Sequence, residues 1–273
     1  MLMGQHIENI EEETAMKKIL LACALTVPAM AMAQSGGTPD TLAKVMESKT
    51  LRVCTPGDYR PFSYHNDDDS YEGLDVDLMA DLAETLDAKV AFVKTTWKNL
   101  MDDFTSGKCD IGAGGISVSL ERQKRAFFSV PYMVNGKTPI TLCTNVEKFQ
   151  TIEDINKPEV RVIHNPGGSN EKFAKTYLNK AKLTEHENNI GIFQEIAEGR
   201  ADVFVTEAAE AKVQSKRDPR LCAVNPDKPL QYAEMGYLLP SGDMRFKLYV
   251  DQWLHLSKAS GAYARLADKW VPQ

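Results

Sequence analysis

Two groups of residues in this 273-residue chain could do anion-binding or acid–base chemistry. The first lies between Gly114 and Leu142, where two glycines are followed by the hydroxyls of Ser117 and Ser119 and the guanidinium of Arg122. Glycines let backbone N–H groups approach a ligand closely, and a guanidinium holds a carboxylate through two parallel hydrogen bonds. We therefore expect Ser117 and Arg122 to anchor a carboxylate.

The second group is Glu207 and Glu210, in the segment TEAAEA. It follows a nearly continuous apolar run, residues 201–206, which is typical of a strand buried on both faces. Residues three apart lie on one face of a helix, so we expect both carboxylates to point the same way. Two glutamates beside a cleft indicate a functional site, whereas one exposed glutamate would not.

Other candidates follow the ends of predicted strands, where ligands bind in open α/β sheets. Asp58, Tyr59 and Phe62 lie in a loop after a strand at 51–54, and Trp97 follows a strand at 89–93. Asp58 could instead only cap a turn, and Trp97 could pack beneath a helix.

The segment Asn165 to Phe173 has glycines leading into a helix, and helix N-termini attract anions. We expect Ser169 to cap this helix and Asn170 to reach a ligand. Lys137 begins an extended segment, 137–142, that would cross between lobes. It could reach the cleft or form an ion pair at the hinge.

The order of predicted elements indicates a two-lobed α/β fold with mostly parallel sheets flanked by helices. Lobe 1 is expected to contain residues 34–138 and 236–273, and lobe 2 residues 139–235. The helix after Gly73 places leucines four residues apart, so it should face the core. Residues 231–239 are expected to form one return strand, and helices at 38–48, 245–259 and 261–270 to pack on lobe 1.

The N-terminus predicts export. Met16 to Lys18 is short and positive, Ile19 to Ala31 is apolar but too short to span a bilayer, and a small-residue cleavage pattern ends at Ala33. Residues 1–33 are therefore interpreted as an upstream segment, 1–15, and a signal peptide. A lipoprotein anchored through Cys23 is a weaker alternative, because too few apolar residues precede that cysteine. We expect a periplasmic protein without a membrane contact after cleavage.

Four cysteines remain after cleavage, an even number that permits disulfides in an oxidising compartment. Cys143 and Cys222 are the favoured pair, because both should lie near strands of the same lobe. Cys54 and Cys109 could form a second disulfide or remain two buried thiols.

Several functions are excluded or disfavoured. A net charge of −6 argues against nucleic-acid binding. The aspartates in NDDDSY are consecutive and lack the glutamate of a calcium loop. The histidines show no zinc spacing, no P-loop ends the glycine segment, and no nucleophile motif occurs. We therefore expect no metal and no cofactor.

The strings GLDVDL, GGISVSLER and FFSVPY resemble the two-lobed bacterial periplasmic amino-acid-binding proteins, over nearly the whole mature chain. The strings TPGDYRPFSY, TTWKNLMDDF, NGKTPITLC, NPGGSNEKFA and YVDQWL are similar to one family on this fold, the cyclohexadienyl dehydratases. The resemblance implies that Glu210 is the catalytic acid, that Arg122 anchors a carboxylate, and that Asp58, Trp97 and Asn170 line the pocket. The family has an aspartate where this chain has Glu207.

The resemblance also implies a reaction. Prephenate or L-arogenate would lose CO₂ and water to give phenylpyruvate or L-phenylalanine, with Glu210 as general acid and no cofactor. Lys137, Ser169 and Glu207 are the remaining expected contacts of this small-molecule substrate. The alternatives are an amino-acid-binding protein of an ABC importer and a relative that binds without turnover. The preferred substrate and the oligomeric state stay open.

Overall fold

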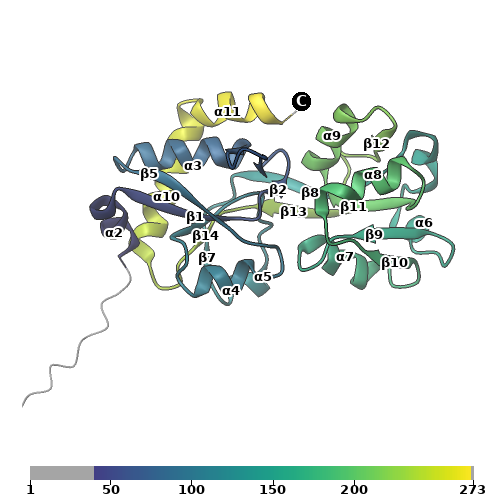
Figure 1. Ribbon diagram of the computed structural model, residues 1–273, viewed down its shortest axis with the longest axis horizontal. Coiled ribbons are helices and arrows are strands. Elements are labelled where there is room, and N and C mark those ends of the chain that lie inside the picture. The colour runs from purple at the N-terminus through teal and green to yellow at the C-terminus, as the bar shows by residue number, and fades with distance from the viewer. Residues whose placement is uncertain (1–39, 272–273) are drawn as a thin grey trace, which may run out of the picture. The chain divides into compact units, whose positions relative to one another are not determined.

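The computed structural model describes residues 40–271, which form two α/β lobes joined by two crossing segments (Figure 1). The predicted signal peptide lies outside the described residues. Among those described, no helix is long and apolar enough to cross a membrane.

Lobe 1 is built on a five-stranded sheet in the order β5-β1-β6-β14-β7. Strand β1 pairs in parallel with β5 and β6, and β14 is antiparallel to β6 and β7. The strands of this lobe are β1 (Thr50–Thr55), β5 (Lys89–Lys94), β6 (Ile111–Gly112), β7 (Phe127–Phe128) and β14 (Leu238–Leu239), with a small separate sheet of β2 (Asp58–Tyr59), β3 (Ser63–His65) and β4 (Tyr71–Glu72).

Helices cover both faces of this sheet (Figure 1). They are α2 (Thr41–Ser48), α3 (Leu74–Glu84), α4 (Leu100–Thr105), α5 (Leu120–Gln123), α10 (Met244–Ala259) and α11 (Ala262–Trp270). Asp40 caps α2 by accepting a hydrogen bond from the N–H of Ala43. Helix α4 begins three residues after Trp97, which lies in the turn before it.

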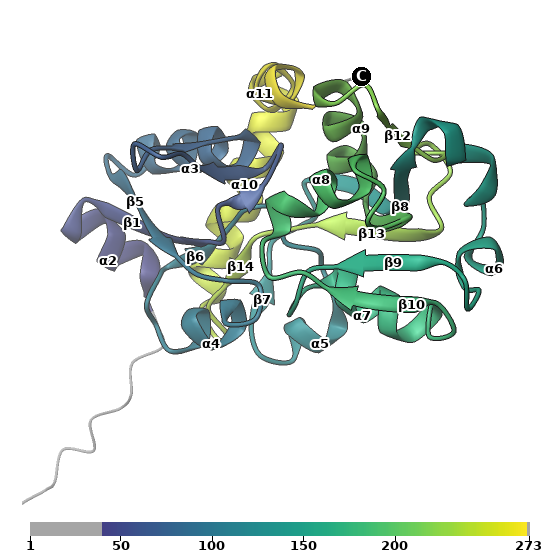
Figure 2. The same cartoon turned by 45° about the vertical axis from the view of Figure 1, so that its right-hand side comes forward.

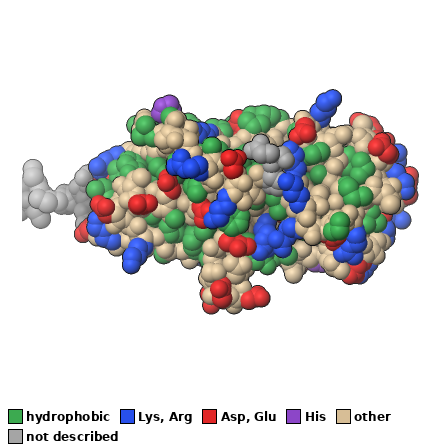
Figure 3. Space-filling view, turned by 90° about the horizontal axis from the view of Figure 1, so that it is seen from above, with side chains coloured by type: hydrophobic (Ala, Val, Ile, Leu, Met, Phe, Trp, Pro, Cys, Tyr) green, Lys and Arg blue, Asp and Glu red, His purple; other side chains and the backbone are tan. Residues whose placement is uncertain are grey.

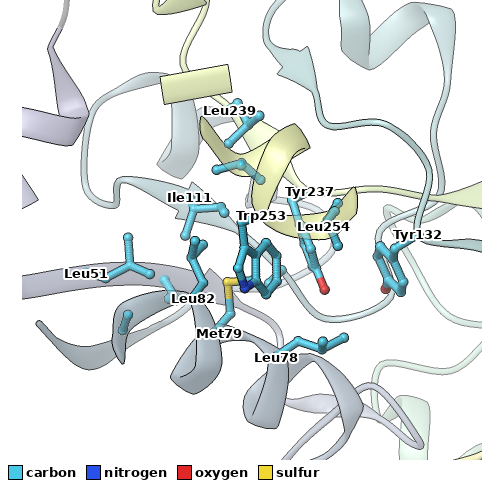
Figure 4. Packing of buried hydrophobic residues seen from close by; sticks show 14 of the residues in the cluster. Leu51, Leu78, Met79, Leu82, Ile111, Tyr132, Tyr237, Leu239, Trp253 and Leu254 are labelled. Carbon is cyan, nitrogen blue, oxygen red and sulfur yellow. The ribbon is translucent and has the colours of Figure 1, made fainter. Parts of the chain in front are cut away.

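The core of lobe 1 joins α3, the sheet and α10, as the leucine spacing predicted for α3. Figure 4 shows Met79 and Leu82 of α3 close to Leu51 and Ile111 of the sheet and to Trp253 of α10. All of these residues but Trp253 are completely buried. Helix α10, near the C-terminus, therefore belongs to the same core as β1. Lobe 1 is thus formed by two parts of the chain that are distant in sequence.

Lobe 2 is built on a six-stranded mixed sheet in the order β10-β9-β11-β8-β12, with β13 also paired to β8 (Figure 2). Strands β9, β10 and β11 are parallel to one another, and β8 runs antiparallel to β11, β12 and β13. The strands are β8 (Met133–Leu142), β9 (Arg161–His164), β10 (Lys182–Glu185), β11 (Val203–Glu207), β12 (Leu221–Ala223) and β13 (Gln231–Met235); the helices are α6 (Ile152–Ile155), α7 (Ser169–Tyr177), α8 (Ile192–Ala197) and α9 (Ala208–Arg217), with 3₁₀ turns η1 (Cys143–Lys148) and η2 (Asn189–Gly191).

Two antiparallel segments connect the lobes, β7 to β8 and β13 to β14. The predicted single return strand at 231–239 is divided, because β13 pairs with β8 of lobe 2 and β14 pairs with strands of lobe 1. Gly236 and Tyr237 lie between them, where the chain passes from one sheet to the other.

Both cysteine pairs form disulfides. Cys143 and Cys222 are bonded with their Cα atoms 4.8 Å apart, and Cys54 and Cys109 with theirs 5.6 Å apart. The favoured pairing is confirmed, and of the two alternatives for Cys54 and Cys109 the disulfide is the one formed.

Candidate active site

A narrow cavity lies between the lobes and is lined by residues of both. Its walls are made by Tyr59, Trp97, Gly115, Ser117, Asn165, Gly168, Ser169, Asn170, Asn189 and Glu207. Its volume is about 10 Å³, near the least that one water molecule requires. The lobes are therefore closed on each other, and a ring-sized substrate needs them to separate before it can enter.

Glu207 is the most heavily bonded group of the cleft. Its Oε1 accepts hydrogen bonds from Lys137 Nζ at 2.7 Å, Ser117 Oγ at 2.9 Å and Ser169 Oγ at 3.2 Å, and its Oε2 accepts one from Tyr59 at 2.6 Å. Burial alone would raise the pKa of Glu207, but the charge of Lys137 and these hydrogen bonds outweigh it and hold the pKa below its usual value. Glu207 is thus a carboxylate bound from both lobes.

The two glutamates do not share a helix face, contrary to the prediction. Helix α9 begins at Ala208, so Glu207 ends β11 while Glu210 lies in the first turn of the helix. Glu210 is 1% exposed and does not line the cavity. Burial, with smaller contributions from the charges of Glu207 and Asp58, raises the pKa of Glu210 well above its usual value. Burial therefore favours the neutral, protonated form of Glu210.

A chain of hydrogen bonds leads from the cleft to Glu210. Lys137 Nζ bonds Asn170 Oδ1, Asn170 Nδ2 lies 3.3 Å from Thr206 Oγ1, and Thr206 donates to Glu210 Oε2 at 2.5 Å. Lys137 does not line the cavity, and of its two expected roles it forms an ion pair, with Glu207 at 2.7 Å, while also bonding Ser169 and Asn170 of lobe 2. Asn170 was expected to be free for a ligand, but both ends of its amide are bonded within the protein.

Ser169 does not cap its helix. Gly168 is the N-cap of α7, and Ser169 is the first helical residue. Its hydroxyl turns into the cleft, where it also lies 3.2 Å from Ser117 Oγ of the other lobe. The prediction of a capping role was wrong because the glycine before it adopts the extended N-cap conformation.

Arg122 stands next to the cavity without lining it. Its Nη1 donates to the carbonyl of Ser117 at 2.9 Å, and it forms no ion pair among residues 40–271. Burial lowers the pKa of Arg122, and the charge of Glu207 opposes that shift. A half-buried guanidinium with unused donors remains suited to a substrate carboxylate.

The glycine turn serves the protein's own carboxylate. The N–H groups of Gly114 and Gly115 donate to Asp75 Oδ2 at 2.7 and 2.8 Å, and Tyr132 donates to the same oxygen at 2.9 Å. A Cβ on Gly115, whose φ is +73°, would come within 2.6 Å of the rings of Tyr59 and Phe62. These glycines fit the turn against lobe 1, and both of their N–H groups donate to Asp75.

Asp58 and Trp97 form one unit at the edge of the cleft. Trp97 Nε1 donates to Asp58 Oδ1 at 2.9 Å, and its ring meets that of Tyr59 edge-on at 5.5 Å. Burial raises the pKa of Asp58 to about 6, although the bond from Trp97 lowers it. Asn189 of lobe 2 donates to the backbone carbonyl of Asp58 at 3.1 Å, so this unit is also an inter-lobe contact.

Several polar residues of the cleft were not predicted from motifs. Thr206, Asn165 and Asn189 are buried, and the Oδ1 atoms of both asparagines have no hydrogen-bond partner within the described chain. Thr206 could have been predicted, because it is a threonine at the end of an apolar strand, directly before Glu207. Nothing in the local sequence distinguishes Asn189, because only the packing of lobe 2 against Asp58 brings it to the cleft.

Two further features lie outside the cleft. Helices α11 and α9 lie near each other (Figure 2). A cavity of about 230 Å³ is lined by residues of both, Arg217 and Trp270, with Arg60 among others, none of them a predicted site residue. His164, Glu171 and Glu185 bring potential metal-ligand atoms within 4.8 Å of one another. Glu171 already bonds the N–H of Gly167 and the ammonium of a lysine, so its oxygens are engaged.

Comparison with known proteins supports the resemblance. Residues 51–273 match the profile of the bacterial extracellular solute-binding proteins, family 3. The chain is 49% identical over 252 residues, 92% of each chain, to the cyclohexadienyl dehydratase of Pseudomonas aeruginosa.

Solved structures agree. The ancestral amino-acid-binding protein AncCDT-1, described as a precursor of cyclohexadienyl dehydratase, has a TM-score of 0.79 at 37% identity, with coverage of 85% of this chain and all of that one. A point variant of an ancestral cyclohexadienyl dehydratase, AncCDT-3, has a TM-score of 0.53 at 52% identity, with coverage of 84% and 95%. The predicted two-lobed solute-binding fold is confirmed, but both sheets are mixed and not mostly parallel, because β14 and β8 run antiparallel to their neighbours. The chain belongs to the bacterial extracellular solute-binding proteins, family 3, and within that family its sequence is similar to cyclohexadienyl dehydratase.

Proposed function

We propose that this protein is a cyclohexadienyl dehydratase that converts prephenate to phenylpyruvate, L-arogenate to L-phenylalanine, or both. The observation that carries the proposal is Glu210, a fully buried carboxyl group whose pKa is raised by desolvation. A binding protein needs charged groups to hold an amino acid, whereas a protonated carboxyl beside a closed cleft can donate a proton.

The charges around the cleft suit an anionic substrate. Among residues 40–271, Arg122 forms no ion pair and Lys137 has one ion-pair partner, Glu207. Ser117 and Ser169 face each other from the two lobes and could bind a carboxylate once the lobes have opened and closed around it. Trp97 stands on the wall where a six-membered ring would lie.

The reaction needs orientation and one proton. The bond from the ring to its carboxylate breaks, its electron pair completes the aromatic ring, and the C4 hydroxyl leaves with a proton from Glu210 as water. CO₂ leaves as a neutral molecule, and Glu210 regains its proton from solvent when the lobes open. General acid catalysis of this kind contributes about 10²–10⁴-fold.

The test is to mix the purified protein with prephenate at neutral pH and follow phenylpyruvate, then to repeat it with Glu210→Gln and with the partly exposed Glu234→Gln as control. We expect turnover by the native protein and the control, and a loss of at least about 100-fold for Glu210→Gln. If the native protein shows no turnover, the proposed enzymatic function is contradicted. If Glu210→Gln keeps full activity, the proposed role of Glu210 as the acid is contradicted. Tight amino-acid binding without turnover would favour the importer function.

The place of action belongs to the same proposal. The family is extracellular, and the segment before residue 34 has the pattern of a secretory signal peptide. We propose that the mature protein acts in the periplasm and begins at Gln34, which N-terminal sequencing of the exported protein would test.

A further inference from the structure

The hydrogen-bond chain from Lys137 to Glu210 has a defined direction. An ammonium group can only donate, so the amide oxygen of Asn170 must face Lys137 Nζ as acceptor. The amide nitrogen of Asn170 then faces Thr206 Oγ1 at 3.3 Å and donates to it. The bond from Asn170 uses one of the two lone pairs of the Thr206 oxygen, and the hydroxyl hydrogen can be donated to Glu210 Oε2, 2.5 Å away.

The direction of the Thr206 bond sets which oxygen of a neutral Glu210 carries the proton. When Thr206 donates to Oε2, the acidic hydrogen lies on Oε1. Oε1 is buried and has no hydrogen-bond partner within the described residues. Lys137, Asn170, Thr206 and Glu210 are all at most 7% exposed, so bulk water does not compete for these bonds.

We propose that Thr206 is a positioning residue that keeps the acidic proton of Glu210 on Oε1, and that Asn170 sets the direction of the Thr206 hydrogen bond. The inference rests on the proposed function, in which Glu210 is the acid. It assigns Asn170 to the orientation of the acid instead of direct substrate contact. It also gives Lys137 a second role, because its charge orders the chain as well as pairing with Glu207.

Three variants separate positioning from a structural role. Thr206→Val keeps the branched shape but removes the hydroxyl, and Thr206→Ser keeps the hydroxyl. Thr141→Val is the matched control, because Thr141 is a buried threonine of the same sheet whose hydroxyl binds the carbonyl of Asp202 at 2.7 Å. We expect kcat to fall about 10–100-fold in Thr206→Val, and to stay within a few-fold of the native value in Thr206→Ser and Thr141→Val.

The pH dependence of kcat gives a second readout. Activity requires protonated Glu210, so it falls as pH rises through the pKa of Glu210. The bond from Thr206 lowers that pKa. Its loss in Thr206→Val should move the fall in activity to higher pH, while Thr206→Ser should keep the native profile. An unchanged profile in Thr206→Val would contradict the proposal.

Infrared spectroscopy tests the proton position without turnover. The carbonyl band of protonated Glu210 is the band lost in Glu210→Gln at neutral pH. Since Oε2 accepts the Thr206 hydrogen bond, this band should move to higher frequency in Thr206→Val and remain in place in Thr206→Ser. A band that does not move overturns the positioning role even if the enzyme turns over prephenate. A band that moves in a protein without turnover supports the positioning role and overturns only the proposed reaction, and no such band at all overturns both.

Discussion

At the scale of single residues, burial and neighbouring charges shift the pKa values of the three carboxyl groups near the cleft in different directions. The charge of Lys137 helps to hold the pKa of Glu207 below its usual value, and desolvation raises the pKa of Glu210 well above its usual value. Asp58 lies between these cases, with a pKa raised to about 6. The same functional group, a carboxyl, therefore has a different pKa at each of these three positions.

Asp58→Asn should stabilise the protein at neutral pH. Raising the pKa from 3.8 to about 6 means that the folded state ionises Asp58 at a cost, which is fully present above about pH 6 and absent below about pH 4. Removing the charge should therefore increase the free energy of unfolding by about 2–3 kcal/mol at about pH 7. At about pH 4 it should leave the free energy of unfolding nearly unchanged. Urea unfolding at the two pH values measures this difference.

The exposed Asp67→Asn is the control, since it changes the same side chain without burial. An equal gain for Asp58→Asn at the acidic and the neutral pH would rule out the titration of Asp58 as its cause. The amide oxygen introduced by this substitution could still accept the hydrogen bond of Trp97, so a loss of stability at both pH values would also contradict the prediction.

At the scale of elements, each disulfide joins segments within one lobe. Cys54 of β1 is bonded to Cys109, shortly before β6, the strand that pairs with β1. Cys143, at the end of β8, is bonded to Cys222 of the edge strand β12. The bonds join residues separated by 55 and 79 positions, so they reduce the number of conformations open to the unfolded chain.

Cys143→Ser/Cys222→Ser and Cys54→Ser/Cys109→Ser should each lower the free energy of unfolding by about 4 kcal/mol. Because the two bonds lie in different lobes, the two losses should add in the fourfold variant. Urea unfolding of the three variants, compared with the native protein under oxidising conditions, measures both effects. A loss below about 1 kcal/mol for either pair would show that its bond does not stabilise the folded state.

At the scale of the whole described chain, the lobes touch through a glycine. Gly167 has φ +81°, and a Cβ there would come 2.4 Å from Cα of Lys98 in the other lobe. Together with the bonds of Glu207 to Tyr59 and Ser117, this contact belongs to the closed arrangement. Charged side chains of both signs are interspersed on the face seen in Figure 3, with no single basic field among the residues described there.

The cleft between the two lobes is too small for a ring-sized substrate, with a volume of about 10 Å³. Substrate entry therefore needs the lobes to separate. We therefore expect the lobes of this protein to open and close about the crossing segments.

Gly167→Ala should hinder closure. The added Cβ would meet backbone atoms of Lys98, which cannot move aside as a flexible side-chain end could. Small-angle X-ray scattering should give a larger radius of gyration than for the native protein, and turnover should fall about 10-fold or more because the acid is not brought to the substrate.

Gly199→Ala is the matched control for backbone strain. Gly199 has a similar φ, +72°, but an added Cβ would have no neighbour within 4 Å. Gly199→Ala should lower the free energy of unfolding as much as backbone strain does in Gly167→Ala, but it should leave the radius of gyration at the native value. Equal scattering curves for Gly167→Ala and the native protein would contradict the role of this contact in closure.

The sequence by itself determined the order and type of most elements, because their periodicity and turn residues are local. The leucine stripe of α3, the apolar strand β11 and the terminal helices on lobe 1 were all predictable, as was the Cys143–Cys222 pair. Family-like strings also indicated the acid, the carboxylate anchor and the reaction. These inferences need only neighbours in the chain or the resemblance.

Only the tertiary structure decided what the site residues contact. Gly114 and Gly115 bind Asp75, 39 and 40 residues away, and Asn170 bonds Thr206, 36 residues away. No local pattern specifies these contacts. Glu207 faces the cleft from a strand end, so it does not share the helix face of Glu210. The physical reason is that hydrogen-bond direction, burial and pKa depend on the packing of two lobes, and that packing joins segments far apart in the chain.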